Sequence, residues 1–124
     1  MKEQAKENFT KAVKKLKEAN EELFRPEEDV VSSLVCKNAQ FVIENYLKGY
    51  LLQQNIDIKQ YTTIEMLFEQ CVKINPKFIT IDLSNFQCKS HTFGDAFCND
   101  VKKVNNCFDV ADSIDTFFRQ KNII

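Results

Sequence analysis

Residues 35–52 read VCKNAQFVIENYLKGYLL, and this stretch decides the fold. Its apolar residues recur at helical spacing and cover well over half of the circumference of a helix. A helix that is apolar on most sides lies in the middle of a bundle rather than on its surface. One line of polar side chains nevertheless runs along it, here called the polar stripe: Lys37, Gln40, Glu44 and Lys48. The stretch therefore predicts a buried central helix whose polar stripe is solvated, paired or used for binding.

The chain before this stretch predicts a first helix over residues 3–24. Lysines and glutamates cover most of it, and its inward face consists of Phe9, Ala12, Val13, Leu16, Ala19 and Leu23. A turn at Arg25 and Pro26 follows, and acidic residues after the proline favour the start of the central helix. We expect that helix to continue to about Gln54 and to end at Asn55 and Asp57.

The chain after the central helix predicts two more long helices and a short one. Thr62 and Glu65 have the spacing of a capping box, so a third helix starts there and ends at Asn75 and Pro76. Its inward residues are Ile64, Leu67, Phe68, Cys71 and Ile74. We expect a short helix near 78–88, a loop over 90–99 and a last helix over 99–121. The inner face of that last helix is Val101, Val104, Phe108, Ala111, Ile114 and Phe118.

These patterns predict one all-α domain over residues 1–124, an antiparallel up-and-down bundle of four long helices plus a short fifth. A chain of this length buries roughly two-thirds of its unfolded surface and folds without a disulfide or a metal. The 17 basic and 18 acidic residues balance, so composition gives no reason to expect nonspecific binding to nucleic acid.

The five cysteines include no CxxC pair and their number is odd, which is typical of buried thiols in a reducing compartment. The first residues lack the apolar core of a signal peptide, and no apolar run approaches the ~20 residues that span a bilayer. We therefore expect a cytoplasmic protein without a membrane association.

Three side-chain groups allow both a functional and a structural interpretation. Four possible zinc ligands occur near one another in the sequence, but they lack two tight ligand pairs, so buried thiols are favoured: Cys88, His91, Cys98 and Cys107. Acidic residues spaced by three on the last helix favour a solvated face over a metal site: Asp109, Asp112 and Asp115. Several aromatic residues suit either the core or an interface: Tyr46, Tyr50, Tyr61 and Phe117. We expect no metal site and no cofactor.

The order of the elements, together with residues 36–48 (CKNAQFVIENYLK) and 63–71 (TIEMLFEQC), resembles the HEPN domain family. The family signature on the second helix is similar to the residues found here at Ala39, Gln40, Glu44, Leu47 and Lys48. The resemblance extends over nearly the whole chain. It implies a helical bundle that forms a homodimer and pairs with a minimal nucleotidyltransferase in a prokaryotic toxin–antitoxin module. It also implies nucleotide binding, and many members of the family are metal-independent ribonucleases.

The ribonuclease members use an arginine followed, after four to six residues, by a histidine. RNA cleavage needs such a pair because a proton must be moved while a cation holds the scissile phosphate. The single histidine here is His91, and the positions of the arginine are occupied by Ser84, Asn85 and Phe86. Lys89 is the nearest cation, but its spacing does not match. The resemblance therefore implies a member without the catalytic pair, with His91 as the weak catalytic candidate.

We thus arrive at one preferred interpretation and two alternatives. The preferred one is a noncatalytic HEPN-like binding module whose candidate contact residues are Lys37, Gln40, Glu44, Lys48 and Lys89. In this interpretation the lysines meet phosphate or a partner protein, whereas the structural interpretation of the stripe is a solvated rim with a favourable Glu44–Lys48 pair. The first alternative is a diverged ribonuclease toxin that uses His91 with Lys89. The second is a structural helical adaptor without a ligand.

Overall fold

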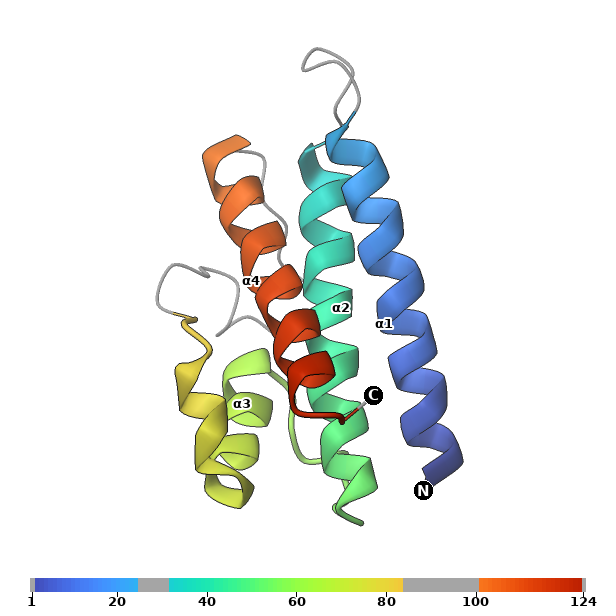
Figure 1. Ribbon diagram of the computed structural model, residues 1–124, viewed down its shortest axis with the longest axis vertical. Helices are drawn as coiled ribbons and strands as arrows, with labels where there is room; N and C mark the ends of the chain where they lie inside the picture. Colours follow the sequence, from blue (N-terminus) through green and yellow to red (C-terminus); the bar gives the residue numbers. More distant parts are fainter. Residues whose placement is uncertain (1, 25–31, 84–100, 124) are drawn as a thin grey trace.

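The computed structural model describes residues 2–24, 32–83 and 101–123. Its elements are α1 (Lys2–Leu23), α2 (Ser32–Gln53), α3 (Ile64–Ile74), the 3-10 helix η2 (Pro76–Thr80) and α4 (Val101–Gln120). The predicted all-α bundle is confirmed. As Figure 1 shows, α2 lies between α1 and α4, and α1 runs antiparallel to both. Helices α2 and α4 run in the same direction.

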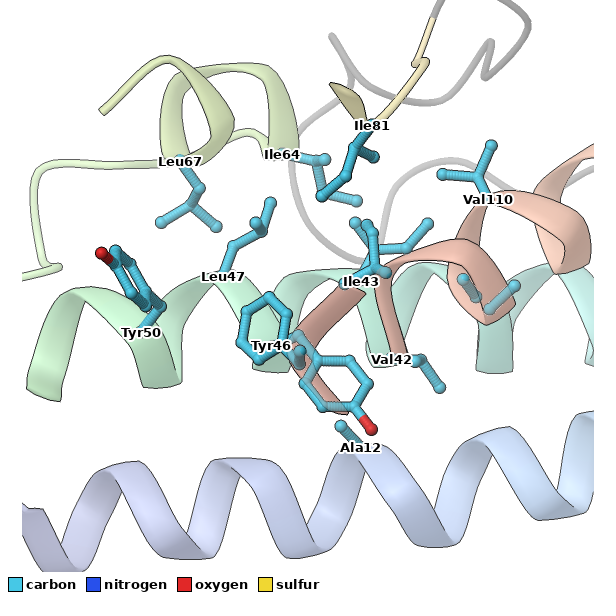
Figure 2. Packing of buried hydrophobic residues seen from close by; sticks show 14 of the residues in the cluster. Ala12, Val42, Ile43, Tyr46, Leu47, Tyr50, Ile64, Leu67, Ile81 and Val110 are labelled. Atoms are coloured by element: carbon cyan, nitrogen blue, oxygen red, sulfur yellow. The ribbon is translucent and has the colours of Figure 1, made fainter. Parts of the chain in front are cut away.

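The central position predicted for α2 is confirmed by the burial of its side chains. Eight of them are completely inaccessible to solvent: Val35, Cys36, Ala39, Val42, Ile43, Tyr46, Leu47 and Leu51. Figure 2 shows how α2 contributes to the core between α1, α3 and α4. Such burial of apolar area is the main favourable term in folding, at roughly 25 cal/mol per Å².

An aromatic cluster joins α1, α2, η2 and α4. The ring of Phe118 on α4 lies 4.8 Å from that of Tyr46 on α2 and 5.7 Å from that of Phe9 on α1, measured between centroids. Phe78 of η2 extends the cluster, with centroid distances of 4.7 Å to Tyr50 and 4.8 Å to Phe117. The core interpretation is therefore confirmed for Tyr46, Tyr50 and Phe117, while Tyr61 is half-buried.

Most of the predicted helix boundaries agree with the structure to within two residues. The expected end of the central helix is confirmed, because Asn55 takes a left-handed φ of 62° and Ile56 N–H donates to the Leu51 carbonyl, as in a helix-terminating motif. Asn75 caps the end of α3 and also the start of η2, where its side chain accepts from Lys77 N–H at 3.1 Å. Since Pro76 lacks an N–H, α3 cannot continue through it.

Three details of the sequence prediction are wrong. The cap of α3 is Thr63 rather than Thr62: the Thr63 hydroxyl accepts from Met66 N–H at 3.1 Å, so Glu65 is one position too early for a capping box. Val13 is 38% exposed, because α1 turns its Ala12 side rather than its Val13 side toward α2. The short fifth helix is the 3-10 turn η2, ahead of the expected position, and residues 84–88 lie outside the described residues.

Candidate functional site

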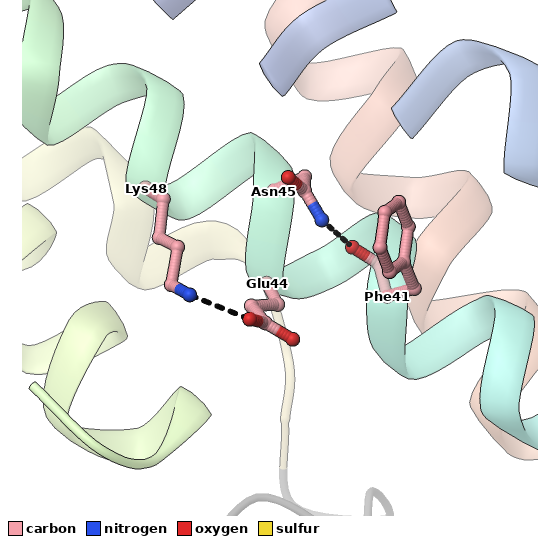
Figure 3. Close-up of polar contacts among 4 residues, drawn as sticks. All are labelled: Phe41, Glu44, Asn45 and Lys48. Atoms are coloured by element: carbon pink, nitrogen blue, oxygen red, sulfur yellow. Dashed lines mark hydrogen bonds and ion pairs between the residues drawn. The ribbon is translucent and has the colours of Figure 1, made fainter. Parts of the chain in front are cut away.

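The polar stripe lies on α2, where only Lys37 is well exposed and the other three side chains are half-buried. Lys48 Nζ donates to Glu44 Oε1 at 2.6 Å, and about a fifth of each of these side chains is accessible (Figure 3). Gln40 Nε2 donates to the Cys36 sulfur at 3.3 Å. The stripe is therefore largely paired within its own helix, and the interpretation as a fully solvated rim holds only for Lys37.

Two candidate residues, Lys89 and His91, lie outside the described residues, as do Cys88 and Cys98. Cys107 is described, and it is buried with its sulfur 3.7 Å from that of Cys36. Across the described ranges, no three histidine, cysteine or carboxylate side chains come together as potential metal ligands. The three aspartates of α4 have different environments: Asp109 and Asp112 are exposed, whereas Asp115 is largely covered.

A groove of about 320 Å³ between α1 and α4 is the most complete candidate site among the described residues. We call it the α1–α4 groove, and it is lined by Val13, Leu16, Lys17, Asn20, Phe108, Asp112, Asp115 and Arg119. Helix α1 supplies the first four of these residues, since positions three and four apart share one face of a helix. None of the stripe residues lines this groove.

At the wall of the groove, a hydrogen-bonded chain links the surface to the core. The hydroxyl of Tyr46, whose ring is fully buried, donates to Asp115 Oδ1. Arg119 Nε donates to the other carboxylate oxygen, Asp115 Oδ2, at 2.9 Å, and the arginine side chain is 54% exposed. The Asp115 carboxylate, which accepts from the buried Tyr46 hydroxyl, thus holds the Arg119 guanidinium at the surface.

The ionisation of these groups follows from their surroundings. Burial, and then the hydrogen bond to Asp115 and its charge, raise the pKa of Tyr46 well above the ordinary value for a tyrosine. The hydrogen bond to Asp115 and its charge also raise the pKa of Arg119. Tyr46 is therefore a neutral donor and Arg119 a fixed cation at physiological pH. This arrangement suits recognition of a ligand better than proton transfer, which needs a group with a pKa near the working pH.

Cys71 is a buried thiol of α3 that faces α2. Its sulfur donates to the Leu47 carbonyl at 3.8 Å, and burial raises the pKa of the thiol. Because the thiolate is the reactive form, Cys71 is not an activated nucleophile. Its contribution is to packing.

Two other grooves of comparable size lie among the described residues. One, of about 250 Å³ between α1 and α2, is lined by Lys15, Glu18, Glu21, Glu22, Leu34 and Asn38. The other, of about 370 Å³, runs between η2 and α4 and is lined by Thr80, Ile81, Asp82, Asp112, Ser113, Thr116, Phe117 and Gln120. The α1–α4 groove differs from both in combining exposed apolar area with cations from two helices.

Sequence reasoning did not identify the α1–α4 groove or the chain behind it. A usable signal was present, because Asp115 and Arg119 are spaced by four on one helix and form a favourable pair. A second signal was Tyr46 on the most buried helix, since a buried tyrosine hydroxyl needs a hydrogen-bond partner. The sequence pattern did not show that α2 and α4 lie side by side and parallel, which brings Tyr46 and Asp115 together.

Comparisons with protein-family models, with curated proteins and with solved structures find no match for this chain. Within the described part of the chain, no helix has the length and apolar character required to cross a membrane.

Proposed function

We propose that this chain is a noncatalytic, HEPN-like binding module that receives an amphipathic helix of a partner protein in the α1–α4 groove. The observation that carries the proposal is the groove itself, whose apolar residues remain accessible although the core beside them is closed. Val13 is 38% exposed, and Leu16 and Phe108 are half-buried. An apolar groove between two helices is the feature into which an amphipathic helix places its apolar face.

The charges at the groove define the partner helix more closely. Lys17 of α1 and Arg119 of α4 both line it, and Arg119 is held in place by Asp115. A guanidinium has five N–H donors in a planar fork that matches a carboxylate, and the contact with Asp115 uses the one on Nε. We therefore expect the partner helix to combine an apolar stripe with an acidic residue that meets Arg119.

The absence of catalysis is part of the proposal and rests on two features. The arginine that the ribonuclease motif requires before His91 is replaced by Ser84, Asn85 or Phe86. At the groove, Tyr46 and Arg119 each keep one protonation state at physiological pH, because their pKa values are raised away from neutrality. A minimal nucleotidyltransferase is the partner class that the family resemblance implies.

The test is selection of a displayed library of amphipathic helical peptides against the purified protein, followed by affinity measurements on two variants. Val13→Asp places a charge on the apolar floor and should weaken the selected peptides at least tenfold. Ile79→Asp makes the same kind of change at an apolar residue of η2 that is 74% exposed, and should leave their affinity unchanged. Peptides that bind both variants as well as the original protein would contradict the groove as the site.

Separate measurements test the remaining expectations. Light scattering tests the homodimer, and thermal shift with nucleotides tests nucleotide binding, since a ligand at 100 times its Kd stabilises by about 2.7 kcal/mol. Incubation with varied RNAs tests the enzyme alternative. Metal-independent cleavage that is lost in His91→Ala would replace the proposal with a ribonuclease toxin.

A further inference from the structure

Two cysteines that are far apart in the sequence meet inside the bundle. The sulfur of Cys36 on α2 lies 3.7 Å from the sulfur of Cys107 on α4, and the two residues are 71 positions apart. Both are reduced thiols, with 0% and 2% of their surface exposed. Cys71, also fully buried, meets a backbone carbonyl instead. The pair is therefore a specific juxtaposition, not a general property of the buried cysteines of this chain.

We propose that Cys36 and Cys107 form a site of reversible oxidation, at which a hydroperoxide converts the two thiols into a disulfide between α2 and α4. The sulfur atoms of a disulfide are about 2.0 Å apart, so each needs to move by less than about 1 Å from its present place. Because the two helices already pack against each other, this movement requires side-chain rotation and a small adjustment of the backbone rather than a new fold.

A hydrogen-bond donor beside Cys36 makes this sulfur the one that we expect to react first. Gln40 Nε2 donates to the sulfur of Cys36 at 3.3 Å, and a donor of this kind favours the thiolate. The Cys36 thiolate attacks the hydroperoxide, the O–O bond breaks, and with hydrogen peroxide one water leaves as Cys36 becomes a sulfenic acid. The sulfur of Cys107 then attacks the sulfenic sulfur, the S–S bond forms and a second water leaves. Two thiols are oxidised by two electrons and one peroxide is reduced.

The disulfide would join α2 and α4 at one end of their contact. Helices α2 and α4 run side by side in the same direction, and the contact of Tyr46 with Asp115 already joins them two to three turns below the cysteine pair. A disulfide at Cys36 and Cys107 would add a second tie near the other end. It would also close a long loop, and cross-links that close long loops restrict the unfolded chain most.

The burial of both sulfurs predicts slow oxidation. A peroxide reaches them only when α2 and α4 separate locally, so the rate should level off at high peroxide concentration. The product, once formed, is shielded from reductants in the same way. We therefore expect a site that responds to sustained exposure to oxidant.

The test uses the full chain with Cys88→Ser and Cys98→Ser, so that Cys36, Cys71 and Cys107 remain. Treatment with hydrogen peroxide under native conditions should lower the intact mass by about 2 Da, the mass of the two hydrogens lost on forming an S–S bond. Trypsin should then release peptide 18–37 linked to peptide 104–119. The midpoint of thermal unfolding should rise by several degrees and return to its starting value after reduction.

Cys71 is an internal control, because it should remain available to iodoacetamide after the oxidised protein is unfolded. Cys36→Ala and Cys107→Ala should each abolish the linked peptides and the rise in the midpoint, and circular dichroism verifies that each variant folds. A linkage of either cysteine to peptide 60–73, or the absence of any linkage in the folded protein, would overturn the proposal. So would a linkage that forms only in denaturant.

Discussion

On one side of α2, Tyr46 donates to Asp115, a residue 69 positions further along the chain. On nearly the opposite side of the same helix, about 160° away at 100° per residue, Glu44 pairs with Lys48 one turn along. Tyr46 is fully buried and its partner belongs to α4, whereas Glu44 and Lys48 are partly accessible and belong to one helix. The two sides thus place polar groups in different physical situations.

The difference concerns what each polar contact can specify. A contact within one helix forms wherever that helix forms, so the Glu44–Lys48 pair adds to α2 without fixing its neighbours. The Tyr46–Asp115 contact forms only when α2 and α4 are parallel and in register, because a buried hydroxyl that loses its partner costs free energy. The inner side of α2 should therefore contribute most to the free energy of unfolding and the outer side little. Substitutions on both sides test this ordering.

Leu47→Ala should have the largest effect, because Leu47 is completely buried between α2 and α3. Loss of its side chain should lower the free energy of unfolding by about 2–5 kcal/mol. Leu34→Ala is the matched control on the same helix, since Leu34 is 42% exposed and should cost less than about 1 kcal/mol. Urea unfolding measures both. Equal effects of the two substitutions would show that the two sides of α2 do not differ as the structure places them.

Tyr46→Phe keeps the ring in the aromatic cluster and removes only the donor to Asp115. Because a hydrogen bond to a charged group is lost, we expect a cost of about 1.5–3 kcal/mol. Tyr50→Phe makes the same change one turn away, where no hydrogen bond of the hydroxyl to a described residue is observed, and should cost less than about 0.5 kcal/mol. If Tyr46→Phe costs no more than Tyr50→Phe, the Tyr46–Asp115 hydrogen bond does not stabilise the packing of α2 against α4.

The same hydroxyl predicts a dependence of stability on pH. An unfolded tyrosine has a pKa of about 10, and burial with the contact to Asp115 raises the pKa of Tyr46 in the folded protein. Above pH 10 the unfolded state therefore releases a proton that the folded state retains, and the free energy of unfolding falls as pH rises. Unfolding curves between pH 8 and 11 should show a steeper loss for the original protein than for Tyr46→Phe.

Gly49→Ala tests the side of α2 that faces α1. A Cβ at this position would lie 2.5 Å from Cε1 of Phe9, whose ring is held against Tyr46 and Phe118. The higher helix propensity of alanine contributes about 1 kcal/mol, whereas overpacking costs about 1–3 kcal/mol, so we expect a net loss of up to about 2 kcal/mol. Combining it with Phe9→Leu should give less than the sum of the two single losses. Additive losses, or a gain in stability for Gly49→Ala alone, would mean that α1 and α2 lie further apart than in the structure.

The sequence predicted those parts of the fold that depend on local patterns. The spacing of apolar residues was sufficient to predict α1, α2, α3 and α4. Asn55 and Pro76 were sufficient to predict where two of these helices end, because such signals act over a few residues. The shift of the cap from Thr62 to Thr63 shows the limit of such signals, since two adjacent threonines offer the same kind of oxygen and the sequence does not show which of them accepts from the helix N–H.

The candidate site was less accessible to prediction because it depends on contacts between distant residues. The polar stripe was correctly placed on the least apolar side of α2, but most of it is paired within the helix. The α1–α4 groove arises from Val13, assigned to the core, and from Asp115, assigned to a solvated face. Neither assignment could be corrected without the packing of α4 against α1 and α2.

The smallest expected effect is that of the Glu44–Lys48 pair, and a double-mutant cycle with Glu44→Gln and Lys48→Met measures it. Since Glu precedes Lys by four residues in the favourable orientation, we expect a coupling energy of about 0.2–0.5 kcal/mol that declines as salt is added. This value lies several-fold below the expected cost of Tyr46→Phe, as a contact confined to one helix requires. A coupling above about 1.5 kcal/mol that resists salt would mean that the pair is held by more than its own helix, and the polar stripe would then become a structural contact equal to that of Tyr46 with Asp115.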